Sequence, residues 1–184
     1  MPNEDLSIAL FGGSFDPPHI GHIAIIEALE KLAYIDKIII MPTFLNPFKS
    51  KSHASAELRF KWLEKIFKDF KNIEISKYEV SQNKKVPSIE SVNYLLTQYK
   101  KIYLVIGADN LQSLTNWTNF EELNTKVDFI VASRNNIEID KKFTILKVAE
   151  TISSTALREN IQKSKLPLRC QEEIYEFYKE TDEK

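Results

Sequence analysis

The sequence predicts an α/β fold in which helices flank a doubly wound, mostly parallel sheet. Short runs of apolar and β-branched residues alternate with longer segments whose apolar residues recur every three or four positions. The run at residues 36–41 is continuously apolar in its later part, which is typical of a strand covered on both faces. Two glycines separate the first predicted strand from the first predicted helix. In sheets of this kind, ligands bind at the carboxyl ends of the strands.

The first half of the chain reads as strand, helix, strand, long loop and helix. Residues 6–11 form an apolar run, and residues 20–34 show a helical pattern with Ile23, Ile26, Leu29 and Ala33 facing inward. A strand at 36–41 then implies a right-handed crossover between parallel strands. The connection at 42–55 is long for a compact domain and rich in serine and lysine, which favours a functional loop.

The second half continues the alternation. Its apolar patterns predict helices at 58–70, 88–99, 116–123 and 153–163, and strands at 73–75, 101–107, 127–132 and 143–148, with a further short strand at 78–80. Pro167 suits the first turn of a last helix that ends near Tyr178. The charged tail from about residue 179 is expected to fray. We expect residues 1–184 to form a single domain.

The composition excludes several classes of protein. A chain of 184 residues suits one domain, and 25 Lys and Arg against 26 Asp and Glu provide no positive field for a nucleic acid. The single cysteine, Cys170, excludes a disulfide framework, fits a reducing compartment and is expected to pack in the core. No apolar run has membrane-spanning length, and the acidic N-terminus is unlike a signal peptide. We therefore expect a cytoplasmic protein without nucleic-acid or membrane partners.

Residues 12–22 carry the strongest chemical signal, Gly-Gly-Ser-Phe-Asp-Pro-Pro-His-Ile-Gly-His. Gly12 and Gly13 allow the main chain to approach a ligand, and the first amides of the following helix favour an anion. His19 and His22 stand three residues apart at the start of that helix, and Gly21 clears space between them. This pattern predicts a phosphate site.

Each part of this segment also has an ordinary interpretation. A glycine pair is usually a turn, and a lone histidine usually has a structural role. The two histidines could form half of a metal site, but the third histidine, His53, lies in a polar segment, and no cysteine cluster or HExxH helix completes a ligand set. We therefore expect no protein metal site.

Taken as a whole, the segment resembles the nucleotidylyltransferase superfamily, and within it the bacterial nicotinate-nucleotide adenylyltransferases. The resemblance implies a Rossmann-like fold of the nucleotidylyltransferase type. It also implies that His19 and His22 are catalytic and that Asp16 binds the mononucleotide. The residues that it assigns to ATP here are Gly12, Gly13, Ser14, Phe15 and Gly21.

A second motif spans Ile152, Ser153, Ser154, Thr155 and Arg158. Serine and threonine at a helix start are normally caps, but the arginine one turn later projects to the same end, which suits a polyphosphate. The superfamily has an Ile-Ser-Ser-Thr motif that is followed three positions later by Arg. This motif binds the β- and γ-phosphates of ATP. The resemblance therefore assigns residues 152–155 to ATP binding and Arg158 to catalysis.

The middle of the chain carries weaker signals. Asp109 could simply cap a helix, Trp117 could be core and Arg134 could be a surface cation. By resemblance, Gly107 and Asp109 border the adenosine, and Trp117 stacks on the pyridine ring. The remaining residues that the resemblance assigns to the mononucleotide are Lys49, Ser88 and Arg134.

One departure from the family pattern lies near the expected pyridine site. The family usually has Pro-Ser-Tyr-Thr there, whereas this chain has Pro87, Ser88, Ile89 and Glu90. A carboxylate pointing into the site would repel the anionic substrate. We therefore expect Glu90 to turn away or to pair with a cation.

The reaction that the resemblance implies is transfer of AMP from ATP to nicotinate mononucleotide, with Mg²⁺ carried on the ATP phosphates. The two histidines, preferably protonated beside the phosphates, would contact the α- to β-phosphate region. Alternatives are another small-molecule adenylyltransferase, notably pantetheine-phosphate adenylyltransferase, and a regulatory module that binds a nucleotide without catalysis. A likeness of residues 19–22 to a class I aminoacyl-tRNA synthetase signature is set aside because the chain has no room for a tRNA-binding module. The oligomeric state is left open, with a homodimer as one option.

Overall fold

The computed structural model describes residues 5–149 and 152–182, and within them six parallel strands form one sheet. The strands are β1 (Ser7–Gly13), β2 (Lys37–Pro42), β3 (Ile73–Ile75), β4 (Lys101–Gly107), β5 (Asp128–Ala132) and β6 (Thr144–Leu146). Their order is β3-β2-β1-β4-β5-β6, and every neighbouring pair is parallel. This arrangement confirms the predicted α/β fold and is the strand order of the doubly wound dinucleotide-binding sheets. The order reverses between β1 and β4, where a crevice is expected.

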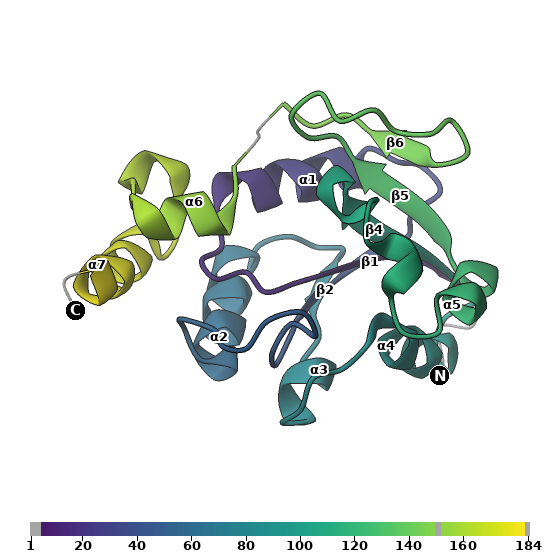
Figure 1. Ribbon diagram of the computed structural model, residues 1–184, viewed down its shortest axis with the longest axis horizontal. Coiled ribbons are helices and arrows are strands. Elements are labelled where there is room, and N and C mark those ends of the chain that lie inside the picture. The colour runs from purple at the N-terminus through teal and green to yellow at the C-terminus, as the bar shows by residue number, and fades with distance from the viewer. Residues whose placement is uncertain (1–4, 150–151, 183–184) are drawn as a thin grey trace.

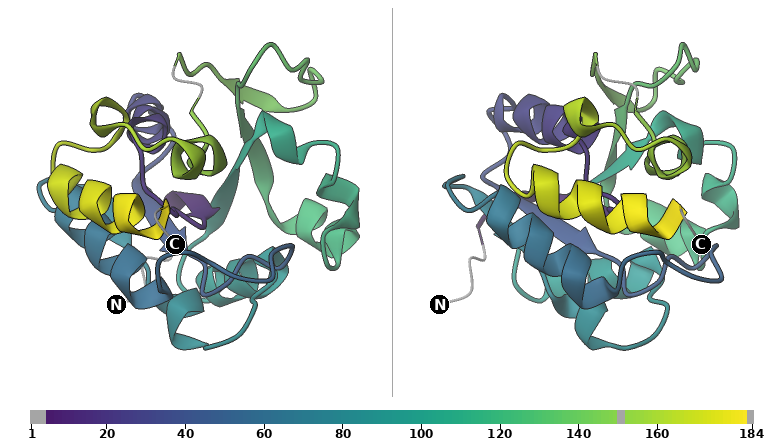
Figure 2. Two further views of the ribbon diagram at one scale, coloured as in Figure 1. Left: turned by 60° about the vertical axis from the view of Figure 1, so that its left-hand side comes forward. Right: turned by 90° about the vertical axis from the view of Figure 1, so that its left-hand side faces the viewer.

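Helices cover both faces of the sheet. They are α1 (Ile20–Glu30), α2 (Ala56–Ile66), α3 (Tyr78–Ser81), α4 (Ser88–Leu96), α5 (Phe120–Lys126), α6 (Ser154–Glu159) and α7 (Gln171–Asp182). Figures 1 and 2 show α1, α2, α6 and α7 gathered on one side of the sheet, and α4 and α5 on the other. Both views in Figure 2 place α7 alongside α2. Within the described ranges, no helix combines the length and the apolar character needed to cross a bilayer.

The core divides into two clusters because strand side chains alternate between the faces. In β1, Ala9 and Phe11 pack with α1, α2 and α7, whereas Ile8 and Leu10 pack with α4 and α5. All four side chains are buried. The central strand is thus apolar on both faces, as its sequence indicated.

Residues 78–80 were predicted as a strand, and this prediction is wrong. They belong to α3, a single helical turn that follows the three-residue edge strand β3. The hydroxyl of Ser76 accepts a hydrogen bond from the amide of Tyr78 at 3.3 Å, and the ring of Tyr78 stacks on Tyr94 with the centroids 4.0 Å apart. These contacts favour a turn over a continued strand.

Several helix ends also differ from the prediction. Helix α1 ends at Glu30 and not at residue 34, because the amide of Lys31 bonds to the carbonyls of Ala28 and Leu29 in a tight last turn. The helix predicted at 116–123 instead begins at Phe120, after Asn119 takes a left-handed conformation with φ of 51°. Helices α2, α4 and α6 likewise end earlier than their sequence patterns predicted.

The C-terminal helix starts later and continues further than predicted. It begins at Gln171, after Cys170 with φ of 65°, and it extends through Asp182. Pro167 therefore lies outside the helix, and residues 179–182, which were expected to fray, are helical. Ile174 and Tyr178 are buried against the core and hold this helix in place, and Cys170 packs at the core edge as expected.

Candidate active site

A cavity of about 550 Å³ opens at the carboxyl ends of the central strands, at the point where the strand order reverses. Its walls come from the loops after β1, β2, β4 and β5 and from the start of α6. All of the predicted site residues line it except Asp16 and Arg158. They are Gly12, Gly13, Ser14, Phe15, His19, Gly21, His22, Lys49, Ser88, Gly107, Asp109, Trp117, Arg134, Ile152, Ser153, Ser154 and Thr155.

The two histidines form a stacked pair at the start of α1. His19 is the extended residue before the helix, and its backbone N–H donates to Nδ1 of His22 at 3.1 Å. Because Nδ1 of His22 accepts this bond, the proton of the neutral ring lies on Nε2. The ring centroids are 3.6 Å apart, and a Cβ atom on Gly21 would lie 2.9 Å from Nδ1 of His19. The glycine is therefore needed to leave room for the His19 ring.

The pKa of each histidine lies below its usual value because both rings are buried. Burial lowers the pKa of His19 to about 3, and the nearby Arg134 adds to this effect. Burial also lowers the pKa of His22 well below its usual value, with further contributions from His19 and Arg134. The protonation expected beside phosphates therefore depends on the charge of the bound anion, which would raise both pKa values.

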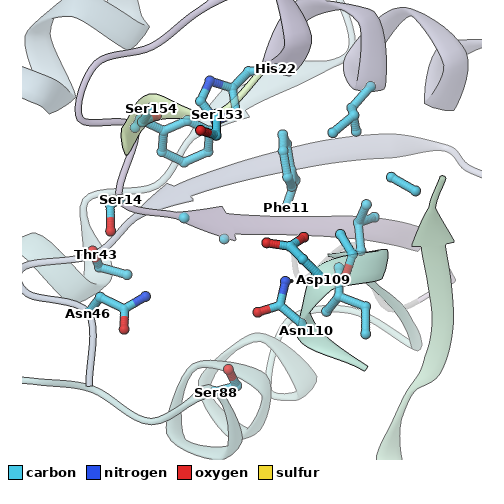
Figure 3. Close-up of a pocket in the computed structure, with 18 of the residues that line it drawn as sticks. Phe11, Ser14, His22, Thr43, Asn46, Ser88, Asp109, Asn110, Ser153 and Ser154 are labelled. Atoms are coloured by element: carbon cyan, nitrogen blue, oxygen red, sulfur yellow. Dashed lines mark hydrogen bonds between the residues drawn. The ribbon is translucent and has the colours of Figure 1, made fainter. Parts of the chain in front are cut away.

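The start of α6 docks directly on the loop that carries the histidines. The hydroxyl of Ser154 donates to the carbonyl of Pro17 at 2.9 Å, and the hydroxyl of Ser153 caps the helix by accepting from the amide of Ala156 at 3.0 Å. Figure 3 shows His22, Ser153 and Ser154 together on one side of the pocket. Two segments that lie far apart in the chain thus form one end of the cavity, which we call the phosphate end (His19, His22 and residues 153–155).

Arg158 reaches this loop but does not line the cavity. Its guanidinium donates to the backbone carbonyl of Asp16 and, at 3.2 Å, to the hydroxyl of Thr155. The side chain thus lies next to the phosphate end and bonds to the chain on both sides of it.

Asp16 occupies a different place from the one predicted. Its side chain is 3% exposed, and its oxygens accept hydrogen bonds from the amides of His53 and Ala54 at 2.8 and 2.9 Å and from the hydroxyl of Tyr178. Burial raises the pKa of Asp16, but these hydrogen bonds and the charge of Arg59 outweigh it, so the pKa lies below its usual value. The carboxylate therefore joins three segments of the chain, and the geometry does not support the predicted contact with the mononucleotide.

Arg59 supports the same loop from within the core. Its guanidinium is fully buried and donates to the carbonyls of Ala54, Ser14 and Phe44 at 3.1, 2.6 and 3.0 Å. One side chain thereby connects α2 with the loops after β1 and β2. This connection fixes the backbone on which Ser14 and Asp16 lie.

The wall formed by β4 and β5 carries a paired charge. Arg134 and Asp109 form an ion pair at 3.2 Å, and a Cβ atom on Gly107 would lie 2.6 Å from Oδ1 of Asp109. Gly107 is therefore required for the present position of Asp109. The charge of Arg134 also contributes to the lowered pKa of both histidines.

Ser88, at the first turn of α4, lies on the far side of the pocket from His22 (Figure 3). Trp117 also lines the cavity and packs in part against the second core cluster. The expectation for Glu90 is confirmed, because its carboxylate pairs with Lys84 at 3.0 Å and is 43% exposed. We call this region the Ser88 end of the cavity.

Buried polar atoms without partners are concentrated in this cavity. Within residues 5–149 and 152–182, the buried side-chain atoms that lack a hydrogen-bond partner are Nδ1 of His19, Oγ1 of Thr43, Oε2 of Glu79 and Nε1 of Trp117. All four residues line the cavity. An unpaired buried polar group is costly, so atoms of this kind at one cavity indicate a site that a polar ligand completes.

Sequence reasoning missed six polar residues of the wall: Thr43, Asn46, Glu79, Asn110, Thr118 and Ser133. Figure 3 shows Thr43 and Asn46 opposite Asp109 and Asn110. Thr43 directly follows β2, so the rule that ligands bind at the carboxyl ends of parallel strands could have found it. No sequence signal pointed to Glu79, which lay in a segment predicted as a strand.

The fold and the two convergent segments define a nucleotidyltransferase of the cytidylyltransferase-like class, whose sequence model matches residues 10–160. A "Probable nicotinate-nucleotide adenylyltransferase" of Sulfurimonas denitrificans is 64% identical over 174 residues, which are 95% of this chain and 96% of that protein. A protein of the same name from Campylobacter jejuni is 47% identical over 176 residues, with coverage of 94% and 97%. The chain therefore belongs to the nicotinate-nucleotide adenylyltransferase family.

Solved structures agree with the fold. The Plasmodium falciparum nicotinic acid mononucleotide adenylyltransferase complexed with NaAD superposes with a TM-score of 0.77, at 20% identity and with 96% of each chain covered. The same enzyme complexed with APC superposes with a TM-score of 0.70 at 19% identity, again with 96% of each chain covered. At these identities the likeness supports the fold alone.

Proposed function

We propose that the protein transfers the AMP moiety of ATP to the phosphate of nicotinate mononucleotide, which gives nicotinate adenine dinucleotide and pyrophosphate in NAD biosynthesis. The observation that carries the proposal is the meeting of His19 and His22 with residues 153–155 at one end of a single cavity. Family membership supports the identity of both substrates.

The phosphate end suits a triphosphate. The start of α1 presents two imidazoles and the partial positive charge of a helix N-terminus, and residues 153–155 contribute hydroxyls and amides from the adjacent start of α6. We assign the histidines to the α- to β-phosphate region, and residues 153–155 with Arg158 to the departing pyrophosphate. Donors at these places stabilise charge that grows on the leaving group.

The acceptor needs no general base. A phosphomonoester has its second pKa near 6, so its attacking oxygen is already ionised at pH 7. What the protein must supply is alignment of two anions that repel one another, together with neutralisation of charge on the leaving group. The histidines serve this role as hydrogen-bond donors to the phosphates, and no residue has to remove a proton from the acceptor.

Magnesium belongs to this scheme as part of the ATP substrate. In the part of the chain that the structure describes, no three His, Cys, Asp or Glu side chains lie together as a metal group. We propose that the ion arrives on the ATP phosphates with water as its other ligand, where it neutralises charge on the pyrophosphate. The polar groups nearest to it would be those of the phosphate end.

The Ser88 end is assigned to nicotinate mononucleotide. Trp117 offers a ring for stacking on the pyridine, Ser88 offers a hydroxyl at the start of α4, and Lys49 is a cation in the loop after β2. A cytoplasmic location stays a prediction of the sequence, and the sequence leaves the oligomeric state open, with a homodimer as one option.

Steady-state release of pyrophosphate tests the proposal. Purified protein with MgATP should turn over nicotinate mononucleotide and release one pyrophosphate per dinucleotide formed. Turnover with phosphopantetheine in its place would indicate the rival adenylyltransferase. Binding of ATP without turnover of nicotinate mononucleotide, its amide or phosphopantetheine would favour a regulatory module and contradict the proposal.

A further inference from the structure

Glu79 has an unusual position for a carboxyl group. Its side chain is 6% exposed, and it lines the cavity from α3. One oxygen, Oε1, accepts a hydrogen bond from the hydroxyl of Ser91 at 2.6 Å. The other oxygen, Oε2, is buried without a partner. The protein thus satisfies one oxygen of the carboxyl group, and the other oxygen lacks a hydrogen-bond partner among the described residues.

The contact with Ser91 places Glu79 at the Ser88 end of the cavity. Ser91 lies one turn after Ser88 in α4, so the two serines share a side of this helix. Figure 3 shows Ser88 across the pocket from His22, Ser153 and Ser154. Glu79 therefore lies by the part of the cavity assigned to the pyridine nucleotide and away from the phosphate end.

The two cations that line the cavity make no bond to Glu79. Lys49 lies in the loop after β2. Arg134 is paired with Asp109. Neither of them supplies the partner that Oε2 of Glu79 lacks.

We propose that the unpaired oxygen of Glu79 hydrogen-bonds the substituent at position 3 of the pyridine ring and sets the preference between the acid and the amide mononucleotide. The inference rests on the proposed function, because it assumes that a pyridine mononucleotide occupies the Ser88 end. Glu79 and Ser91 would then act close to residues 87–90. The family usually has Pro-Ser-Tyr-Thr there, and this chain has Ile89 and Glu90 in place of the tyrosine and the threonine.

The chemistry depends on the proton of Glu79. A protonated carboxyl donates through its O–H to the carboxylate of the acid substrate, whereas an ionised carboxyl repels that carboxylate and accepts from the N–H of the amide. Burial, with a smaller contribution from Glu90, raises the pKa of Glu79 to about 7 even though the bond from Ser91 lowers it. The balance between the two forms therefore lies within the physiological range.

Other charged groups near Glu79 are engaged in contacts of their own. Glu90 on α4 pairs with Lys84, and Lys77, which precedes α3, pairs with Glu57 of α2. On the loop before α4, Lys85 donates to the carbonyl of Pro47. These groups are exposed and paired, so they do not supply the partner that Oε2 lacks.

The test is the ratio of kcat/KM for the acid to kcat/KM for the amide, measured from pH 6 to pH 8.5 with saturating MgATP. Both substrates carry the same phosphate and use the same histidines, so titration of those groups cancels in the ratio. Since the protonated form of Glu79 falls to about one part in 30 at pH 8.5 for a pKa of about 7, the ratio should fall by about 5-fold to 30-fold over this range.

Three variants separate this role from a structural one. Glu79→Gln keeps a donor and an acceptor without charge, so the ratio should become independent of pH, and kcat/KM for the acid at pH 8.5 should exceed that of the wild type several-fold. Ser91→Ala removes the hydrogen bond that favours the ionised form of Glu79. The pH at which the ratio of the two kcat/KM values has fallen halfway should therefore become higher. The matched control is Glu57→Gln, an exposed and ion-paired glutamate on α2, which should behave as the wild type.

Calorimetry without ATP gives a second readout. Binding of the acid near pH 7.5, measured in two buffers with different ionisation enthalpies, should take up a larger fraction of a proton than binding of the amide, and Glu79→Gln should abolish the difference. The inference would be overturned if the ratio of kcat/KM for the acid to kcat/KM for the amide did not change with pH in the wild type. It would also be overturned if the ratio in Glu79→Gln still changed with pH as in the wild type. Turnover of neither pyridine mononucleotide would overturn the proposed function, and this inference with it.

Discussion

His22 has two roles that can be separated by mutation. Its Nδ1 accepts from the backbone N–H of His19 and so satisfies a donor at the start of α1, while its ring stacks on His19 beside the phosphate end. The first role stabilises the helix terminus. The second places an imidazole where charge develops during the proposed reaction.

His22→Ala should lower kcat by roughly two to four orders of magnitude, as expected for loss of a donor to the transition state. It should also lower the free energy of unfolding by about 1 kcal/mol, because the cap is lost. His22→Gln can restore the cap, since Gln is a suitable third residue of a helix, but it cannot restore the ring. We therefore expect its thermal unfolding to approach that of the wild type while kcat stays low. Near wild-type turnover of either variant would contradict a catalytic role for His22.

At the scale of elements, α7 supports the site from outside it. Tyr178 of α7 donates to Asp16, which in turn accepts from the amides of His53 and Ala54 in the loop after β2. Arg158 of α6 binds the carbonyl of the same aspartate. The loop that carries the histidines is thereby connected to two C-terminal helices.

Tyr178→Phe should lower the free energy of unfolding by about 1–3 kcal/mol, because a buried carboxylate loses one of its donors. The pKa of Asp16 is depressed in the folded protein, so its contribution to stability is present at neutral pH and is lost as the pH falls through the folded pKa. Without the tyrosine hydroxyl, the pKa of Asp16 in the folded protein should be lowered less. Acid unfolding should therefore occur at higher pH. Tyr175→Phe is the matched control on α7, and unfolding by acid and by urea is the measurement. Equal behaviour of the two variants would exclude a supporting role for Tyr178.

At the scale of the whole molecule, the cavity has two ends with different chemistry. The phosphate end joins α1 to α6, and the Ser88 end joins α4 to the segment that carries Trp117. Different segments of the chain therefore form the two ends of one cavity. Substitutions at one end should therefore affect one substrate more than the other.

Trp117→Ala should raise the KM for nicotinate mononucleotide by about 10-fold or more while changing the KM for ATP little, since stacking on a ring contributes about 1–3 kcal/mol. Steady-state kinetics with each substrate varied in turn makes the comparison. An increase confined to the KM for ATP would reverse the assignment of the two ends.

The sequence patterns correctly predicted those strands and motifs that depend only on residues close together in the chain. The strands β1, β2 and β4, the histidine segment and the Ser-Ser-Thr-x-x-Arg motif could all be recognised, because each depends on neighbouring residues. Most helix ends were predicted to lie too late, since tertiary contacts and left-handed residues such as Asn119 decide where a helix stops or starts. The bond from Tyr178 to Asp16 and the burial of Glu79 could not be predicted, because they join segments whose packing the sequence pattern does not reveal.

The docking of Ser154 on Pro17 also bears on which fragments of the protein can bind a nucleotide. The two segments that meet there lie 137 residues apart in the chain. A fragment that ends before residue 152 would lack one of them, so we expect it to bind ATP much more weakly than the full chain even if its sheet still forms.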